Sequence, residues 1–218
     1  DHDISSFVAI GTGTVSDETK PSTQLSPLLF DLTSLQREAN GRFGFSARNT
    51  LGLAQALYER HKVLTYPRTD ARALPEDYLG TIKKTMGMLG ESRDYAPFAK
   101  NVLKNGWVKA NKRIFDNSKI SDHFAIIPTL QAPKHLSEPE QKLYDLVVRR
   151  FLAVFHPAAE YLQTTRVTQI GEHHFKTEGR ILLNPGWLAV YGRSAQDESQ
   201  NLPAVAAGEK IDVLEANA

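Results

Sequence analysis

The spacing of the apolar residues changes twice along this chain of 218 residues. Residues 4–15 are rich in β-branched side chains and punctuated by glycine, as strands are. Apart from a short predicted strand at residues 63–66, strand-like runs return only after Pro157, at residues 164–170, 174–177, 187–191 and 210–214. Between these two parts, apolar side chains recur at the three- and four-residue spacing of helices. The sequence therefore predicts an α+β fold, in which a helical domain is inserted into a domain of antiparallel β strands.

The helical part carries a start signal for each predicted helix. Residues able to cap or open a helix stand at four points, at Asp31 or Thr33, Ser46, Pro75 and Ser137. The first of these helices is predicted to stop at Asn40-Gly41. The last begins with the capping-box pattern Ser137 to Glu140 and ends at His156-Pro157. The polar segment 16–26, which contains Pro21, is predicted to be a loop or hinge.

Composition limits the classes of function. The 26 Lys and Arg residues nearly balance 25 Asp and Glu, so a nucleic-acid partner requires basic residues concentrated on one surface. The chain has no cysteine, which excludes disulfides and thiolate zinc sites. No apolar run approaches the ~20 residues needed to cross a bilayer, so we expect no membrane association. The chain begins at Asp1 and enters directly into an apparent strand, which predicts a segment of a longer polypeptide.

A tyrosine, a proline and an arginine stand together in the run Val63 to Asp70, VLTYPRTD. The β-favouring residues stop at Pro67, which fixes φ and has no N–H, so Tyr66 is expected at a bend. A phenol with an ordinary pKa of ~10 is a poor nucleophile, but a nearby guanidinium favours the phenolate and can hold a phosphate. The pattern suits transesterification on a phosphodiester. By the pattern alone, however, most such tyrosines are half-buried packing residues, and a surface Arg68 paired to Asp70 fits equally well.

Three segments, in the same order along the chain, resemble segments of the type IA DNA topoisomerases. Residues 64–70, LTYPRTD, are similar to the segment that carries the family's nucleophile. Residues 27–40 resemble its Leu-Gln-rich helix entry, and residues 121–129, SDHFAIIPT, resemble its His-containing segment. The Ile-Ile-Pro-Thr ending of the last segment, and Pro67 after the tyrosine, resemble the topoisomerase III branch.

The resemblance implies a reaction, and a division of the chain into three segments that form two domains. Residues 1–27 and 157–218 are expected to form a gate domain of antiparallel strands, and residues 28–156 the inserted helical domain with the nucleophile. Tyr66 is expected to break one DNA strand, to store its 5′ phosphate as a phosphotyrosine ester, and to religate it after strand passage. Arg68 is expected to hold the scissile phosphate and offset the charge that develops on its oxygens.

The resemblance also implies what this chain lacks. The family binds Mg²⁺ through an Asp-x-Asp constellation in a separate N-terminal domain, and this sequence has no such pattern in a βαβ context. Asp1-His2-Asp3 has the spacing, but it stands at a free end. We therefore expect no metal site here, Mg²⁺ in the intact enzyme, and little or no activity from the fragment alone. The expected partners are single-stranded DNA and the missing metal-binding domain of the same polypeptide. The expected protein is a monomer in the bacterial cytoplasm, associated with the nucleoid.

His123 is the second candidate site residue. The resemblance implies that it contacts the DNA backbone near the cleavage site, where a protonated imidazole binds phosphate. The alternative is a hydrogen-bonded histidine packed against Ile126 and Ile127. The pair His173-His174 is a poor metal site, because neighbouring side chains of a strand point to opposite faces.

A basic run provides further candidate DNA contacts. No acidic residue lies between Lys100 and Asp116, and the run contains Lys109, Lys112 and Arg113 together with the rings of Trp107 and Phe115. Interleaved cations and rings suit single-stranded nucleic acid, but they also describe a solvated face with two core aromatics. Arg37, in the Leu-Gln-rich segment, is a further candidate contact.

Other functional classes remain open at this stage. A non-catalytic module that binds single-stranded nucleic acid would keep the fold and lose the chemistry. A tyrosine recombinase would also use a tyrosine, but it carries that residue after its Arg/His cluster, whereas Tyr66 precedes His123. A purely structural protein is the last alternative.

Overall fold

The computed structural model describes residues 11–192, 202–203, 205–206 and 208–213. The chain divides into two compact units. The β unit comprises the described parts of 1–24, 159–185 and 193–218, and the helical unit comprises 25–158 and 186–192. Residues 4–10 of the first predicted strand, and residue 214 of the last, lie outside the described residues. The predicted α+β class, with a helical part between strands, is confirmed.

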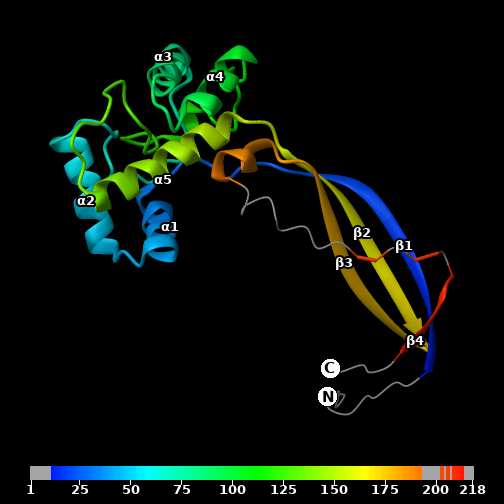
Figure 1. The fold of residues 1–218 in the computed structure, drawn as a ribbon. Helices are drawn as coiled ribbons and strands as arrows, with labels where there is room; N and C mark the ends of the chain where they lie inside the picture. The colour runs from blue at the N-terminus through cyan, green and yellow to red at the C-terminus, as the bar shows by residue number, and fades with distance from the viewer. Residues whose placement is uncertain (1–10, 193–201, 204, 207, 214–218) are drawn as a thin grey trace. The chain divides into compact units, whose positions relative to one another are not determined.

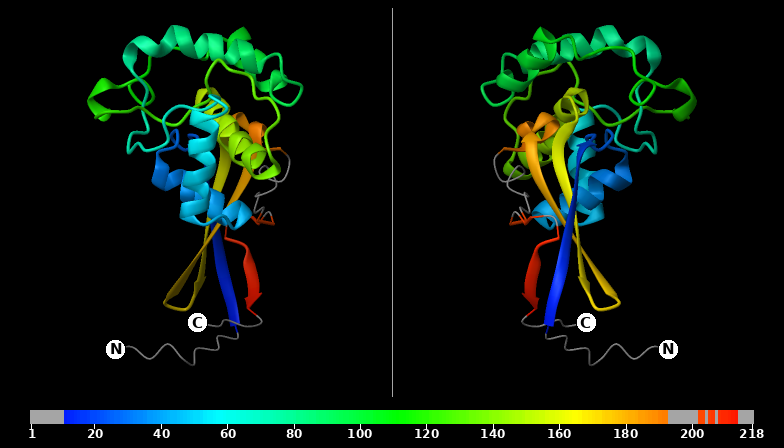
Figure 2. Two further views of the ribbon diagram at one scale, coloured as in Figure 1. Left: turned by 90° about the vertical axis from the view of Figure 1, so that its left-hand side faces the viewer. Right: turned by 90° about the vertical axis from the view of Figure 1, so that its right-hand side faces the viewer.

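The β unit is a four-stranded antiparallel sheet in the order β3-β2-β1-β4. Its strands are β1 (Gly11–Gln24), β2 (Ala159–Ile170), β3 (His173–Asn184) and β4 (Lys210–Val213). The hairpin of β2 and β3 and the shorter β4 beside β1 are visible in Figure 2. Gly171, at φ +57°, takes the left-handed conformation in the hairpin turn.

The predicted loop at 16–26 is wrong for most of its length, because β1 continues to Gln24. Its residues pair with β2 without interruption, from Thr14 opposite Gln169 to Gln24 opposite Ala159. Beyond Thr14, β1 has a strand partner on one side only among the described residues. Proline is tolerated on such an edge, so Pro21 does not end the strand.

The helical unit contains five α-helices among its described residues: α1 (Leu32–Phe43), α2 (Ala47–Glu59), α3 (Leu79–Leu89), α4 (Ala96–Lys104) and α5 (Glu138–Phe155). Three short 3-10 helices accompany them, η1 (Glu76–Tyr78), η2 (Asn117–Lys119) and η3 (Gly186–Tyr191). Helices α1 and α2 pack together, α3 packs on α4, and α5 contacts both pairs (Figure 1). Helix α5 is therefore the centre of this unit's core.

Capping side chains set the helix ends. Asp31, rather than Thr33, caps α1 and forms a capping box with Ser34, whose backbone N–H donates to the Asp31 carboxylate at 2.7 Å. The predicted stop at Asn40-Gly41 is wrong, because α1 runs to Phe43 and ends at Gly44 with φ +70°. The predicted capping box of α5, between Ser137 and Glu140, is present.

The predicted strand at 187–191 is wrong, because these residues form η3. Its apolar side chains are buried, and the backbone carbonyl of Val190 accepts a hydrogen bond of 2.6 Å from Arg149 of α5. The backbone N–H of Trp187 donates to the carbonyl of Pro157 at 3.0 Å. Packing on α5 thus decides the conformation of a segment whose composition favours a strand.

Candidate active site

The three segments singled out from the sequence meet within the helical unit. Phe30 of the first segment pairs with Ile126 of the third as an antiparallel β-bridge. Leu64 of the second segment pairs with Pro128 of the third in the same way. Instead of the predicted strand before Tyr66, the described residues contain this single bridge, and the bend that follows falls at Pro67. The loop of Tyr66 and the loop of His123 are therefore held edge to edge.

Two threonine side chains fasten these loops together. The hydroxyl of Thr65 donates to the carbonyl of Ala125 at 2.9 Å and accepts from the N–H of Ile127 at 2.9 Å. The hydroxyl of Thr69 donates to the carbonyl of His123 at 2.8 Å. Each hydroxyl satisfies buried backbone groups across the junction, so the backbone on both sides of Tyr66 is fixed.

The Tyr66 ring is half-buried between two other rings. Its centroid lies 4.3 Å from that of His123 and 5.3 Å from that of Tyr58, which meets it edge-on at 79°. Tyr66 and Tyr58 also line a pocket of about 620 Å³, with Lys62 and Phe124 on its wall. The His123 side chain is exposed, while Ile126 and Ile127 are buried, so His123 faces Tyr66 rather than the aliphatic core.

The guanidinium of Arg68 is exposed and is oriented by a neutral partner. With the Gln55 amide turned so that its oxygen faces Arg68, that oxygen accepts from Nε at 3.1 Å and from a terminal nitrogen at 3.2 Å. Asp70 instead accepts a hydrogen bond of 3.3 Å from the Ser121 hydroxyl. Among the described residues Arg68 and Asp70 form no ion pair, so the positive charge of Arg68 is not neutralised.

The geometry is that of a phenol beside an imidazole, on a fixed backbone, with an exposed guanidinium two residues away that is not paired with a carboxylate. The sequence pattern of the DNA topoisomerase family matches residues 6–218. The chain belongs to this family.

Individual relatives agree with this assignment. The chain is 45% identical over 203 residues to DNA topoisomerase 3 of Bacillus cereus, a match that covers 89% of this chain and 28% of that protein. It is 44% identical over 197 residues to DNA topoisomerase 3 of Bacillus subtilis, covering 86% of this chain and 27% of the relative. The chain thus spans just over a quarter of these relatives. The predicted resemblance to the topoisomerase III branch is confirmed.

A solved structure shares the fold. Full-length topoisomerase I of Thermotoga maritima superposes with a TM-score of 0.66 at 22% identity, over 94% of this chain and 33% of that one. At this identity the likeness shows the fold alone.

The basic run of the topoisomerase chain is divided among different environments. Lys109 is exposed, and Lys112 forms a 2.6 Å ion pair with Glu76. The hydrogen bond within this pair holds the pKa of Glu76 below its ordinary value and the pKa of Lys112 above its own. Arg113 donates to the backbone carbonyl of Ser26. The run is therefore not a continuous free cationic face.

The two aromatic rings of the basic run, Phe115 and Trp107, differ in how far they are exposed for stacking. Phe115 is buried in the core, where its ring lies 6.1 Å from that of Phe155. Trp107 is half-buried and lies 5.1 Å from the ring of His156. Only Trp107, of these two, presents part of its ring at the surface.

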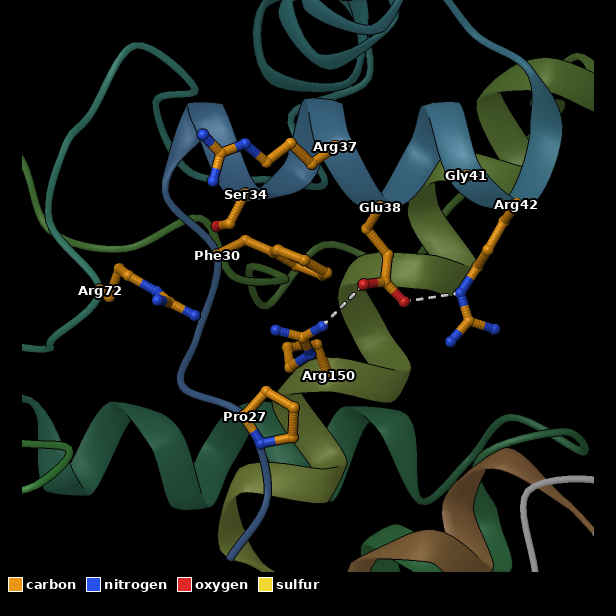
Figure 3. Close-up of a pocket in the computed structure, with 9 residues that line it drawn as sticks. All are labelled: Pro27, Phe30, Ser34, Arg37, Glu38, Gly41, Arg42, Arg72 and Arg150. Carbon is orange, nitrogen blue, oxygen red and sulfur yellow. Dashed lines mark hydrogen bonds and ion pairs between the residues drawn. The ribbon is translucent and has the colours of Figure 1, made fainter. Parts of the chain in front are cut away.

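The structure also assembles residues that the sequence analysis did not single out. Arg37 lies with Arg42, Arg72 and Arg150 around one pocket of the topoisomerase chain (Figure 3). Arg150 comes from α5 and Arg72 from the loop after Tyr66, so no spacing in the sequence connects them with α1. The one signal available beforehand was Arg37 itself.

The described part of the chain contains no group of three or more His, Cys, Asp or Glu side chains able to hold a metal ion. Asp1 and Asp3 lie outside the described residues. None of the helices in the described ranges is long and apolar enough to cross a membrane.

Proposed function

We propose that this chain is the nucleophile-bearing part of a type IA DNA topoisomerase of the topoisomerase III branch. In this proposal residues 28–156 are the helical nucleophile domain, and 1–27 with 157–218 form the gate domain. The substrate is single-stranded DNA. The rest of the polypeptide supplies the Mg²⁺ domain, and the intact protein acts as a monomer in the bacterial cytoplasm, at the nucleoid.

The observation that carries the proposal is the contact between the rings of Tyr66 and His123. Two segments 57 positions apart in the sequence bring a phenol and an imidazole to 4.3 Å, and threonine hydroxyls fix the backbone beneath both. Arg68 adds an unneutralised guanidinium on the same loop. These are the groups needed to hold a phosphodiester beside a nucleophile.

The proposed step exchanges one ester for another. The phenol oxygen of Tyr66 forms a bond to phosphorus, and the bond from phosphorus to the 3′ oxygen breaks. The phenol loses one proton and the 3′ oxygen gains one, so the step needs no further reactant. Arg68 donates to the phosphate oxygens as charge develops on them, and the exposed His123 ring holds the flanking backbone.

Religation is the reverse of this step. The 3′ hydroxyl attacks phosphorus and releases Tyr66. The residues that the structure describes do not fit a Mg²⁺ site, so the chemistry assigned to this chain uses Tyr66, Arg68 and His123 alone.

A chimera tests the proposal. The segment of Bacillus cereus DNA topoisomerase 3 that matches this chain is replaced by residues 1–218, and the chimera is incubated with a single-stranded oligonucleotide and Mg²⁺. We expect a covalent adduct on a denaturing gel when the oligonucleotide is labelled at its 3′ end. Tyr66→Phe should abolish the adduct and preserve binding, whereas Tyr78→Phe, the matched control, should leave both unchanged.

The other outcomes separate the competing classes. A folded chimera that binds the oligonucleotide without forming an adduct would indicate the non-catalytic binding module. An adduct that carries a 5′ label would indicate the linkage of a tyrosine recombinase. The unmodified Bacillus cereus protein serves as the positive control for assembly.

A further inference from the structure

Helix α1 borders a pocket of about 620 Å³ that does not include Tyr66 (Figure 3). Four arginines line it, Arg37 and Arg42 from α1, Arg72 from the loop after Tyr66, and Arg150 from α5. One carboxylate, Glu38, stands among them. We call this site the arginine pocket. Its lining carries four positive charges and one negative charge.

Glu38 neutralises part of this charge. Its carboxylate accepts from Arg42 at 2.7 Å and from Arg150 at 3.3 Å, as the dashed lines in Figure 3 show. The Nε of Arg72 donates a hydrogen bond of 3.0 Å to the backbone carbonyl of Leu29. Arg37 forms no hydrogen bond or ion pair with any other described residue. The terminal nitrogens of Arg72 and the whole guanidinium of Arg37 are therefore available to an anion.

Arg150, which lines the pocket, has a donor without a hydrogen-bond partner. The residue is 5% exposed, and its guanidinium lies 4.0 Å from the centre of the Phe30 ring. Its terminal nitrogens reach the carbonyl of Leu28 and the Glu38 carboxylate, but its Nε is buried without a hydrogen bond. Buried donors are almost always paired, so one donor of a residue that lines the pocket is left unsatisfied.

The positive charge extends beyond the pocket. Burial, and then the charge of Arg72, lower the pKa of Arg113, which means that the two guanidiniums act on each other. Arg113, which donates to the carbonyl of Ser26, also lines a second pocket together with Lys109.

The shape favours an extended anion over a single ion. Ser34, Arg37 and Arg42 lie on one face of α1, and the eight helical steps from Ser34 to Arg42 span about 12 Å. Gly41 lies between them, and a side chain placed there would meet nothing within 4 Å, so the helix surface is open. The first residue of α1, Leu32, donates its N–H to the Thr69 carbonyl at 3.0 Å, which ties this face to the Tyr66 loop.

We propose that the arginine pocket binds backbone phosphates of single-stranded DNA at a distance from the phosphate that reacts with Tyr66. This inference rests on the proposed function, because it extends the path of the same strand. Arg37, and the terminal nitrogens of Arg42 and Arg72, supply the direct contacts, and the buried Arg150 lies behind them.

The test measures non-covalent binding by the 218-residue chain. A fluorescent oligothymidine is titrated by anisotropy at several chloride concentrations, and the logarithm of the binding constant is plotted against that of the salt. Each phosphate contact to a single strand contributes about 0.7 to the slope, so Arg37→Gln should reduce the slope by about that amount. The double variant with Arg42→Gln should reduce it further. Arg93→Gln, the control of equal charge, lies outside the pocket and should leave the slope unchanged.

Each outcome decides the matter. A slope that is equal in wild type and in both variants overturns the arginine pocket and leaves the proposed function standing. A wild-type chain that does not bind the oligonucleotide contradicts the arginine pocket, whereas the proposed function is decided separately by the chimera. In a second arm, inorganic phosphate is added at constant ionic strength. If it displaces the oligonucleotide from wild type but not from the double variant, phosphate and the strand compete for the arginine pocket, as the proposal requires. If it weakens the binding of the oligonucleotide equally in both, the strand does not occupy the pocket and the proposed path is wrong.

Discussion

The helical unit and the β unit keep their folds in different ways. Of the 18 residues of α5, 12 are buried, and they include a continuous apolar run from Phe151 to Phe155. In the β unit, large side chains such as Phe175, Ile181 and Leu183 are exposed, and few described residues are buried. Burial of apolar surface therefore contributes most to the stability of the helical unit. In the β unit the hydrogen bonds and cross-strand pairs of the sheet contribute most.

The difference explains where the candidate chemistry lies. Tyr66, Arg68 and His123 are at least partly exposed, but the backbone beneath them rests on buried residues such as Leu64 and Ile126. Reactive side chains need this combination of an open side chain and a fixed main chain. Long strands with few buried side chains do not provide it.

The largest effect is expected in the centre of the helical core. Phe151→Ala should lower the free energy of unfolding by about 3–5 kcal/mol, because a fully buried ring leaves a cavity. Amide hydrogen exchange should show lost protection in α1 to α5 and little change in the β2–β3 ladder. Equal loss of protection in both units would mean that the stability of the β unit also depends on the core of the helical unit.

The next effect concerns Glu140 at the start of α5. Burial alone would raise the pKa of this carboxyl, but hydrogen bonds from Ser137, Arg60 and His61 outweigh it and lower the pKa to about 2. The unfolded chain, with a pKa near 4.5, therefore takes up the proton first. Stability from Glu140 is complete above about pH 4.5 and is lost as the pH falls from there towards 2.

Glu140→Gln isolates this charge, because glutamine also fits a capping box. We expect the variant to be less stable by about 1.5–3 kcal/mol at neutral pH, the usual range for hydrogen bonds to a charged group. Urea unfolding at a series of pH values should show the gap between wild type and variant closing on acidification. A constant gap down to pH 2 would show that Glu140 does not titrate as described.

A smaller effect on stability is expected at Thr65, with a larger effect on chemistry. Thr65→Val keeps the shape but removes the hydrogen bonds to Ala125 and Ile127, at a cost of about 1–2 kcal/mol. In the chimera, adduct formation should fall while oligonucleotide binding stays near wild type. Thr65→Ser restores the hydroxyl and should restore the adduct, whereas a merely structural role predicts no such separation of cleavage from binding.

The smallest effect is expected in the β unit. The hydroxyls of Thr19 and Thr164 lie 3.0 Å apart across β1 and β2, on an exposed face. Thr164→Ala should lower the free energy of opening of this ladder by about 0.2–1 kcal/mol, measured by hydrogen exchange. A cost as large as that of Phe151→Ala would mean that the sheet depends on side-chain packing after all.

The sequence correctly predicted the features that depend on a few neighbouring residues. The capping box at Ser137, the cap at Asp31 and the bend at Pro67 are each set by a few neighbouring residues. The extent of β1 past Pro21 was missed, because pairing with a strand more than a hundred residues away overrides a local breaker. In the same way, contact with α5 makes η3 out of a strand-like composition.

The residues of the candidate site also differ in whether a local segment of the sequence points to them. Tyr66 and His123 could be singled out because each stands in a recognisable segment. Arg150 could not, because it meets Glu38 across 112 positions of the chain, and only the fold brings them together. The free Nε of Arg150 is likewise a property of packing, which no pattern of residue types expresses.

The packing of two rings against Tyr66 gives the molecule a spectroscopic reporter of its own. Aromatic ring currents displace the proton resonances of a neighbouring ring, and Tyr66 lies close to both Tyr58 and His123. Its ring protons should resonate away from the usual tyrosine positions in the free chain. A strand that enters between Tyr66 and His123 would shift these lines, so nuclear magnetic resonance can follow the arrival of a substrate before any bond has changed.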